Sequence, residues 1–257
     1  MIHDRGFSMI LIITINVNET SYGLASSQIK AWAQTGESRY VCAANVHMLM
    51  EAYDSPEFAS MVNHADLVTP DGMPLVWMMR AKGQNRQSRV YGPTLMLYLL
   101  QAAVQEGLPV GFYGGKPAVL HELVNRMQTH YENLNVAFCY SPSFAPISLE
   151  EDAAIVEKIN QSGARILFVG LGCPKQEIWM AEHRGRVNAV MVGVGAAFDF
   201  HAGLKRQAPA WMQQVGFEWL FRLLMEPKRL WRRYLYHNPR FLFLAIADLF
   251  GLLKKAN

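Results

Sequence analysis

Short apolar runs alternate with longer segments of helical periodicity along most of the chain, a pattern typical of βαβ units and a mostly parallel sheet. The runs that predict strands are Met9–Ile15, Tyr40–Ala43, Leu67–Thr69, Val110–Tyr113, Val136–Cys139, Ile166–Gly170 and Ala189–Gly193. The segments that predict helices are Tyr22–Gln34, Val46–Tyr53, Pro74–Ala81, Thr94–Gln105, Pro117–Tyr131, Leu149–Asn160 and Lys175–Arg184. We therefore predict an α/β, Rossmann-like fold in which helices cover both faces of the sheet.

After Gly203 the pattern changes to helical segments alone. Pro209 and Pro227 each stand where proline suits the first turn of a new helix. This change predicts a Rossmann-like core over residues 1–203 and a helical appendage over residues 204–257.

The appendage combines basic and aromatic side chains. The basic residues are Arg222, Lys228, Arg229, Arg232, Arg233 and Arg240, and the aromatic residues among them are Phe217, Trp219, Phe221, Trp231, Tyr234 and Tyr236. Rings and cations together suit a lipid headgroup interface, although a terminal helical pair with a solvated basic face is the alternative. The apolar segment Phe241–Leu253 favours membrane contact, but it is shorter than the roughly 20 residues of a spanning helix.

Composition narrows the class of protein. Of the 257 residues, 51% are hydrophobic and 18% charged, which excludes a disordered chain. The formal net charge of +3 is too small to indicate a nucleic-acid partner. Cys42, Cys139 and Cys173 lack the spacing of a disulfide framework or zinc site, and the run Met9–Ile15 is too short to span a bilayer or to suggest an export signal. These features predict a cytoplasmic protein.

Ligands of open α/β sheets bind beyond the carboxyl ends of the strands. The candidate segments at these ends are Ala43–Asn45, Thr69–Gly72, Tyr113–Lys116, Gly170–Glu177 and Gly193–Asp199, and the last of these supplies Gly195 and Asp199. Together they predict the rim of a binding site.

Two glycine-containing segments of this rim carry candidate chemistry. Gly114 and Gly115 stand between a strand and a helix, where backbone N–H groups bind phosphate, although a tight turn needs glycine for conformational reasons alone. Gly170 and Gly172 lack the third glycine of a dinucleotide fingerprint, which disfavours a nicotinamide oxidoreductase.

The helix start that follows the second segment offers polar groups instead. Gln176 and Glu177 can bind the hydroxyls of a sugar or base. Glu177 can equally be an acid that interacts with the helix dipole.

Asp71 occupies a Pro-Asp-Gly turn at a predicted strand end. Turn chemistry alone explains an aspartate there, and a general base is the functional alternative. The rim has no Asp-x-Asp pair and the histidines show no ligand spacing, so we expect neither a metal nor a cofactor. His47 and His201 are more simply explained as structural histidines than as catalysts.

Five motifs in order resemble the TagA/WecG/CpsF family of bacterial glycosyltransferases, over about residues 16–236. These motifs are Thr69–Gly72, Arg89–Gly92, Gly170–Glu177, Gly193–Asp199 and Gly216–Leu223. The resemblance implies a metal-independent, inverting transfer from a UDP-sugar to a polyprenyl-diphosphate-linked sugar in cell-surface polysaccharide synthesis, such as teichoic acid or exopolysaccharide.

The resemblance also implies individual roles. The catalytic base falls on Asp71, and the substrate-binding residues fall on Asn45, Arg89, Gly114, Gly115, Gln176, Glu177, Gly195, Asp199, Arg222, Arg229 and Arg232. Without a metal, cations must stabilise the departing UDP, and arginine does so by forked hydrogen bonds.

The chain departs from the family pattern at two places, because Ala43 replaces a frequent threonine and Gly92-Pro93-Thr94 replaces Gly-Ser-Asp. The identity of the hexose, whether N-acetylmannosamine, its uronic acid, glucose or another, therefore stays open.

The expected partners are a UDP-sugar, a lipid-diphosphate-linked glycan and the inner face of the cytoplasmic membrane, with homo-oligomerisation open. The alternative from another class is a non-catalytic, membrane-associated nucleotide-sugar-binding protein.

Overall fold

The computed structural model describes residues 8–143 and 147–253, and it divides the chain into two compact units. Unit 1 comprises Met1–Ser21, Ala43–Tyr91 and Gln207–Asn257, as far as these residues are described, and unit 2 comprises Tyr22–Cys42 and Gly92–Arg206. Each unit is therefore built from segments that are distant in sequence. The division predicted at residue 203, between a core and an appendage, stays a prediction.

A six-stranded sheet confirms the α/β, Rossmann-like prediction. Its strands are β3 (Arg39–Ala44), β4 (Leu67–Pro70), β5 (Val110–Gly114), β6 (Val136–Tyr140), β7 (Ile166–Gly170) and β8 (Val190–Gly193), in the order β4-β3-β8-β7-β5-β6. The pairs β3–β8, β8–β7, β7–β5 and β5–β6 are parallel. In β7 and β8, four consecutive residues each are buried, as expected for strands covered on both faces.

The N-terminal run forms a hairpin instead of the single predicted strand Met9–Ile15. Strands β1 (Met9–Ile12) and β2 (Ile15–Asn18) pair antiparallel, with Ile12 opposite Ile15. Between them Ile13 adopts a φ of 56°, a left-handed conformation that is rare for a β-branched residue. The sequence contains no glycine or asparagine there, so the turn carried no recognisable signal.

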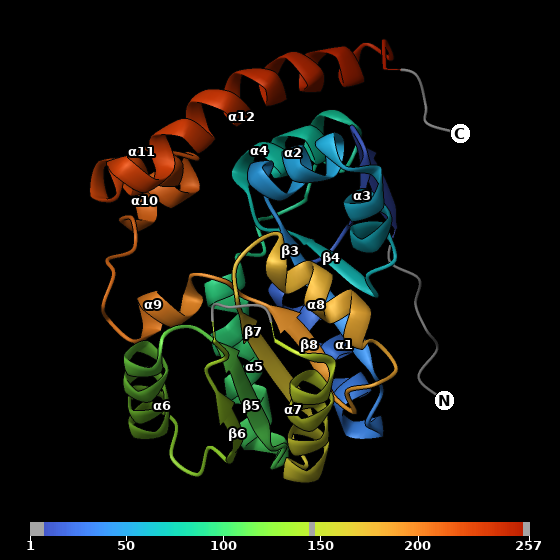
Figure 1. Cartoon of the computed structure of the whole chain (residues 1–257). Helices are drawn as coiled ribbons and strands as arrows, with labels where there is room; N and C mark the ends of the chain where they lie inside the picture. Colours follow the sequence, from blue (N-terminus) through green and yellow to red (C-terminus); the bar gives the residue numbers. More distant parts are fainter. Residues whose placement is uncertain (1–7, 144–146, 254–257) are drawn as a thin grey trace. The chain divides into compact units, whose positions relative to one another are not determined.

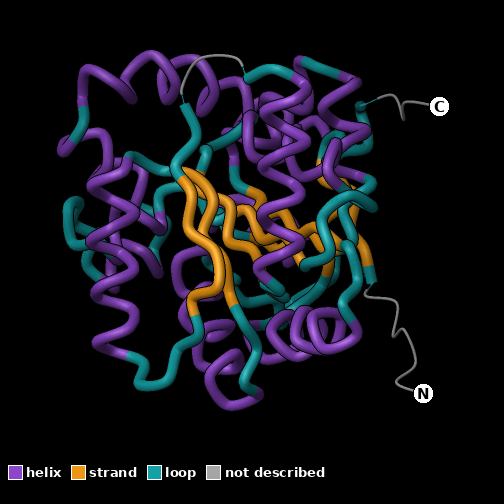
Figure 2. The backbone as a smooth tube through the Cα atoms, turned by 60° about the horizontal axis from the view of Figure 1, so that its bottom comes forward, coloured by secondary structure: helices purple, strands orange, loops and turns teal. Residues whose placement is uncertain are grey.

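Unit 2 surrounds its strands with helices, and Figure 2 shows helices on both sides of the strands. These helices are α1 (Tyr22–Thr35), α5 (Gly92–Glu106), α6 (Pro117–His130), α7 (Leu149–Ser162), α8 (Lys175–His183) and α9 (Ala197–His201). Helix α7 shows why such segments form, because Ser148 caps its first turn through Glu151 N and Gly163 ends it at a φ of 74°.

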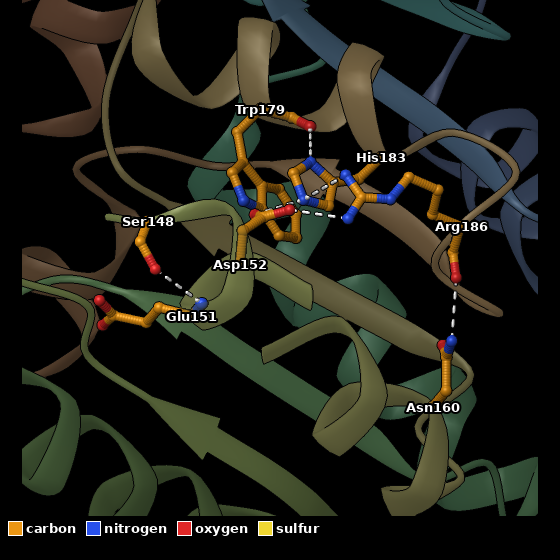
Figure 3. Close-up of polar contacts among 7 residues, drawn as sticks. All are labelled: Ser148, Glu151, Asp152, Asn160, Trp179, His183 and Arg186. Carbon is orange, nitrogen blue, oxygen red and sulfur yellow. Dashed lines mark hydrogen bonds and ion pairs between the residues drawn. The ribbon is translucent and has the colours of Figure 1, made fainter. Parts of the chain in front are cut away.

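A polar cluster joins α7 to α8 in unit 2 (Figure 3). Asp152 accepts hydrogen bonds from His183 Nε2 at 2.8 Å and from Arg186 Nη2 at 2.7 Å. His183 also bonds the carbonyl oxygen of Trp179 through Nδ1 at 2.6 Å. The cluster fixes the start of α7 to the end of α8.

Unit 1 contains six helices within its described residues, of which the last three are C-terminal. These are α2 (Val46–Asp54), α3 (Pro56–Asn63), α4 (Met73–Ala81), α10 (Ala210–Gln214), α11 (Glu218–Met225) and α12 (Pro227–Leu249). Helix α12 packs on α2 and α4, as Figure 1 shows. Pro227 is in the first turn of α12 as predicted, whereas Pro209 immediately precedes α10 as its cap.

One side chain near the end of α12 fixes this helix within unit 1. Asp248 accepts hydrogen bonds from Ile13 N at 3.0 Å and from Lys82 Nζ at 2.8 Å. The lone acid in the apolar C-terminal segment therefore ties the hairpin and α4 to α12.

Candidate functional site

In unit 1, the predicted site residues Asn45 and Asp71 follow the carboxyl ends of β3 and β4. Asp71 N and Gly72 N both donate to Ala44 O, at 2.9 and 3.0 Å, which fixes the turn after β4. Gly72 begins α4, and a Cβ there would lie only 3.2 Å from the Cα of Asn45. Close backbone approach thus favours glycine at this position, whereas its φ of −86° does not require one.

Asn45 serves as the N-cap of α2. Its Oδ1 accepts hydrogen bonds from His47 N at 3.1 Å and Met48 N at 3.2 Å. This capping role explains an asparagine at the position without reference to a ligand. Any contact that Asn45 makes with a sugar would have to be compatible with this cap.

Arg89 connects the Asp71 turn to the C-terminal helices of unit 1. Its Nε donates to the carbonyl oxygen of Asp71, and its Nη2 donates to Glu218 Oε2 at 2.6 Å. The guanidinium lies 4.0 Å from the ring centre of Tyr91, whose hydroxyl donates to Glu218 Oε1 at 3.0 Å. The Arg89 and Glu218 side chains are only 14% and 12% exposed, so this ion pair is largely shielded from water.

Arg222 belongs to the same charged cluster. Burial alone would lower the pKa of Arg222, but the neighbouring Tyr234 and Glu218, with smaller effects from Tyr91 and Asp71, raise it. Burial of Arg89 is likewise outweighed by Asp71 and Glu218, which raise its pKa. Both guanidiniums therefore stay charged in a low-dielectric setting.

The structure thus brings together three of the predicted residues, Asp71, Arg89 and Arg222, from separate sequence motifs. Glu218 joins the two arginines, and sequence reasoning assigned it no role. Its position in the Gly216–Leu223 motif, as one of the few acids among the arginines of the appendage, was a usable signal.

Arg229 and Arg232 occupy a different setting from Arg222. Both are exposed on α12; Arg229 is paired with Glu226 in the first turn, and Arg232 stacks on the neighbouring Trp231 at 5.3 Å. The structure does not bring these two side chains into the buried cluster with Asp71. Their substrate-binding roles stay predictions.

In unit 2, glycines allow the ends of β5 and β7 to approach closely. Gly114 and Gly115 have φ values of 119° and 71°, and a Cβ on Gly114 would lie 2.7 Å from the carbonyl carbon of Gly170. A Cβ on Gly170 would in turn lie 2.6 Å from the ring of Phe198. These contacts support the conformational explanation for the glycine pair, and phosphate binding stays a prediction.

Gln176 and Glu177 are both buried at the start of α8. Gln176 Oε1 accepts from Gly172 N at 3.2 Å, and Gln176 Nε2 donates to Glu177 Oε1 at 2.7 Å. Burial raises the pKa of Glu177 to about 7. Gln176 therefore holds the loop after β7 in place, while Glu177 is a carboxyl group that titrates near neutral pH.

The segment after β8 supplies the remaining candidates. Gly195 adopts a φ of 49° beside the Gln176 side chain, and Asp199 pairs with Lys205 Nζ at 3.2 Å. His201 Nε2 bonds the carbonyl oxygen of Pro93 at 2.9 Å, and burial lowers the pKa of this imidazole. These contacts agree with the prediction that His201 is a structural histidine and not a catalyst.

One group of potential metal ligands occurs within the part of the chain that the structure describes. His47, Glu51 and His237 of unit 1 each place one ligand atom within 4.8 Å of the others. His47 and His237 are distant in sequence, so ligand spacing along the chain could not indicate this group.

Residues 10–255 match the model of the glycosyl transferase WecG/TagA/CpsF family. In the described ranges, every helix is too short or too polar to cross a bilayer.

Proposed function

The chain belongs to the WecG/TagA/CpsF family of glycosyl transferases, and we propose that it moves a hexose from a UDP-sugar to a sugar carried on polyprenyl diphosphate. The cluster of Asp71, Arg89, Glu218 and Arg222 is the observation that carries this proposal. It combines one candidate base with two partly buried cations, which are the groups that a metal-independent transfer requires.

In the proposed mechanism Asp71 is the general base. The acceptor hydroxyl loses its proton to the Asp71 carboxylate as its oxygen attacks the anomeric carbon of the donor. The bond from this carbon to the β-phosphate oxygen breaks, UDP leaves with the electron pair, and the configuration inverts. The backbone hydrogen bonds of the Asp71 turn hold the carboxylate on a fixed strand end, as positioning of a base requires.

Arg222 stabilises the departing diphosphate in this proposal. Its charge is retained despite burial, and a cation in a shielded site acts more strongly on developing negative charge than an exposed one. Arg89 has a positioning role, because its Nε contact holds the Asp71 turn while its ion pair with Glu218 holds α11. Glu218 thereby orients the helix that carries Arg222.

The loops of unit 2, taken by themselves, are the proposed candidates for binding the nucleotide. Gly114 and Gly115 lie at the turn from β5 into α6, where a helix start suits phosphate, but the Gly115 N–H already donates to Gly170 O at 3.2 Å. Gln176, Glu177, Gly195 and Asp199 line the neighbouring loops as candidates for the hydroxyls of the sugar or base. No metal or other cofactor is required by this mechanism.

The proposal also includes a membrane contact, in which helix α12 holds the enzyme on the inner face of the cytoplasmic membrane. Its exposed face carries Leu235, Leu242, Phe243, Ile246 and Leu249, with exposed fractions from 45% to 72%. Exposed basic residues occupy the first turns of the same helix. Apolar side chains beside cations suit the headgroup layer of an anionic membrane.

Replacement of Asp71 by asparagine tests the catalytic assignment. We expect turnover with UDP-sugar and a polyprenyl-diphosphate-sugar acceptor to fall by about 10²–10⁴-fold, because the amide cannot accept the proton. Release of UDP that depends on the lipid acceptor is the measurement. UDP binding should be retained, which isothermal titration can check.

The matched control is Asp66→Asn, because Asp66 immediately precedes β4 whereas Asp71 follows it. The control should turn over at close to the wild-type rate. Wild-type turnover in Asp71→Asn would exclude this residue as the base. Acceptor-independent UDP binding with no transfer by the wild-type protein would favour the non-catalytic binding protein.

A further inference from the structure

Two helices of unit 1 bring three metal-binding side chains together. His47 and Glu51 are one turn apart on α2, and His237 lies on α12, which packs against α2. The rings of His47 and His237 are 5.2 Å apart between centres. The group is partly shielded from water, because the His47, Glu51 and His237 side chains are 15%, 34% and 10% exposed.

The distances within this group fit coordination better than hydrogen bonding. Glu51 Oε1 lies 3.5 Å from His47 Nδ1 and 3.6 Å from His237 Nε2. Both distances are beyond the 2.7–3.2 Å of ordinary nitrogen–oxygen hydrogen bonds. Ligands bound at about 2.0–2.2 Å around a tetrahedral zinc ion stand about 3.3–3.6 Å from one another. The two separations that involve Glu51 are close to this range, and the third pair of ligand atoms lies within 4.8 Å.

The charges around the group are compatible with a cation. The nearby Arg240 is bound to both carboxylate oxygens of Asp54, which offsets its positive charge. Glu51 contributes one negative charge to the group itself.

We propose that His47, Glu51 and His237 form a binding site for a divalent transition metal, with Zn²⁺ the best match. Two imidazoles and one carboxylate are a donor set of known zinc sites, and they leave a fourth position for water. The site joins α12 to α2, and the proposed transfer chemistry needs no metal. Bound metal would therefore stabilise unit 1 without supplying a catalytic group.

Cobalt spectroscopy tests the geometry of the site directly. We expect about one equivalent of Co²⁺ to bind the metal-free protein and give the intense visible absorption of a tetrahedral ion, and Zn²⁺ to abolish this absorption. His237→Gln and His47→Gln should weaken metal binding by at least about tenfold. His121→Gln is the matched control, because His121 is exposed on α6 of unit 2, and it should bind metal like the wild type.

Thermal unfolding provides a second measurement that needs no activity assay. Zn²⁺ at about a hundredfold excess over its Kd should raise the Tm of the wild type by about 5 °C and leave His237→Gln unchanged. Circular dichroism before the titration shows whether each variant is folded. Absence of stoichiometric Co²⁺ or Zn²⁺ binding by the wild type, or equal binding by the wild type and both histidine variants, would overturn the proposal. Neither result depends on whether the chain transfers a sugar.

Discussion

Glu177 is a carboxyl group without exposed surface, and its burial has a predictable effect on stability. Its pKa is raised from 4.5 to about 7 in the folded protein. Between these values the folded state holds a proton that the unfolded state has released, so stability falls as the pH rises from about 4.5 to 7. We expect Glu177→Gln, which cannot ionise, to gain Tm relative to the wild type as the pH rises from 5 to 8.

The control for this experiment is Glu182→Gln, which removes an exposed carboxylate from the same helix. Its Tm should follow the wild type at every pH. Thermal scans monitored by circular dichroism provide the comparison. A constant Tm difference between Glu177→Gln and the wild type across this range would contradict the raised pKa.

Some residues of the candidate site could be predicted from the sequence and others could not. Asp71 and Gly114 could be predicted as candidates because strand ends and glycine turns leave a local signal. The pairing of Arg89 with Glu218 leaves no such signal, because the loop that carries Arg89 and helix α11 meet only in the folded unit 1. The same reason explains why the group around His237 was overlooked.

At the scale of elements, the joint between α7 and α8 rests on Asp152. Burial would raise the pKa of Asp152, but hydrogen bonds from Arg186 and His183 outweigh it, so the net pKa is lowered. The ionised carboxylate therefore stabilises the fold above pH 4, and this contribution is lost as the pH falls through the lowered pKa. We expect Asp152→Asn to reduce the free energy of unfolding by about 1–3 kcal/mol at pH 7.

Urea denaturation at pH 7 and at pH 3 would measure this difference, which should shrink at the lower pH. Glu157→Gln is the comparison, because Glu157 is exposed on the same helix and is bonded only to Gln161 among the contacts described. Its effect should stay below about 0.5 kcal/mol. A loss in Asp152→Asn that is no larger than this would show that the cluster contributes little to stability.

Elements differed in how well the sequence predicted them. Strands such as β7 were predicted to the residue, because a buried apolar run ends at glycine. Helix α3 was missed, although Ser55 caps it and Pro56 begins it, because it spans only eight residues directly after α2. The turn at Ile13 was missed because packing around the hairpin, including the hydrogen bond to Asp248, overrides the local preference of isoleucine.

At the scale of the whole molecule, the C-terminal helices are proposed to have two roles that mutation can separate. Arg222 on α11 lies in the cluster with Asp71, whereas Leu242 and Phe243 on α12 are exposed by 61% and 72%. If Arg222 serves transfer and Leu242 and Phe243 serve membrane attachment, a mutation can remove either function and leave the other intact. A simple terminal helical pair would show neither effect.

We expect the double variant Leu242→Ser, Phe243→Ser to lose sedimentation with anionic lipid vesicles while it keeps wild-type turnover on a soluble acceptor analogue. Arg222→Lys should show the reverse, because lysine keeps the charge but cannot make the forked contact with a diphosphate. Its turnover should fall by at least about tenfold. Leu149→Ser removes a leucine that is 85% exposed in unit 2, and it should change neither measurement.

Vesicle sedimentation and turnover separate the roles of α11 and α12, because each variant is expected to lose only one of these two activities. Vesicle binding that survives the double serine variant would show that the apolar face of α12 is not the attachment surface. Full turnover by Arg222→Lys would remove Arg222 from the diphosphate site and leave α11 a structural support for Arg89 through Glu218. If both activities fell together in each variant, the helices would act as one unit in which membrane docking and transfer are coupled.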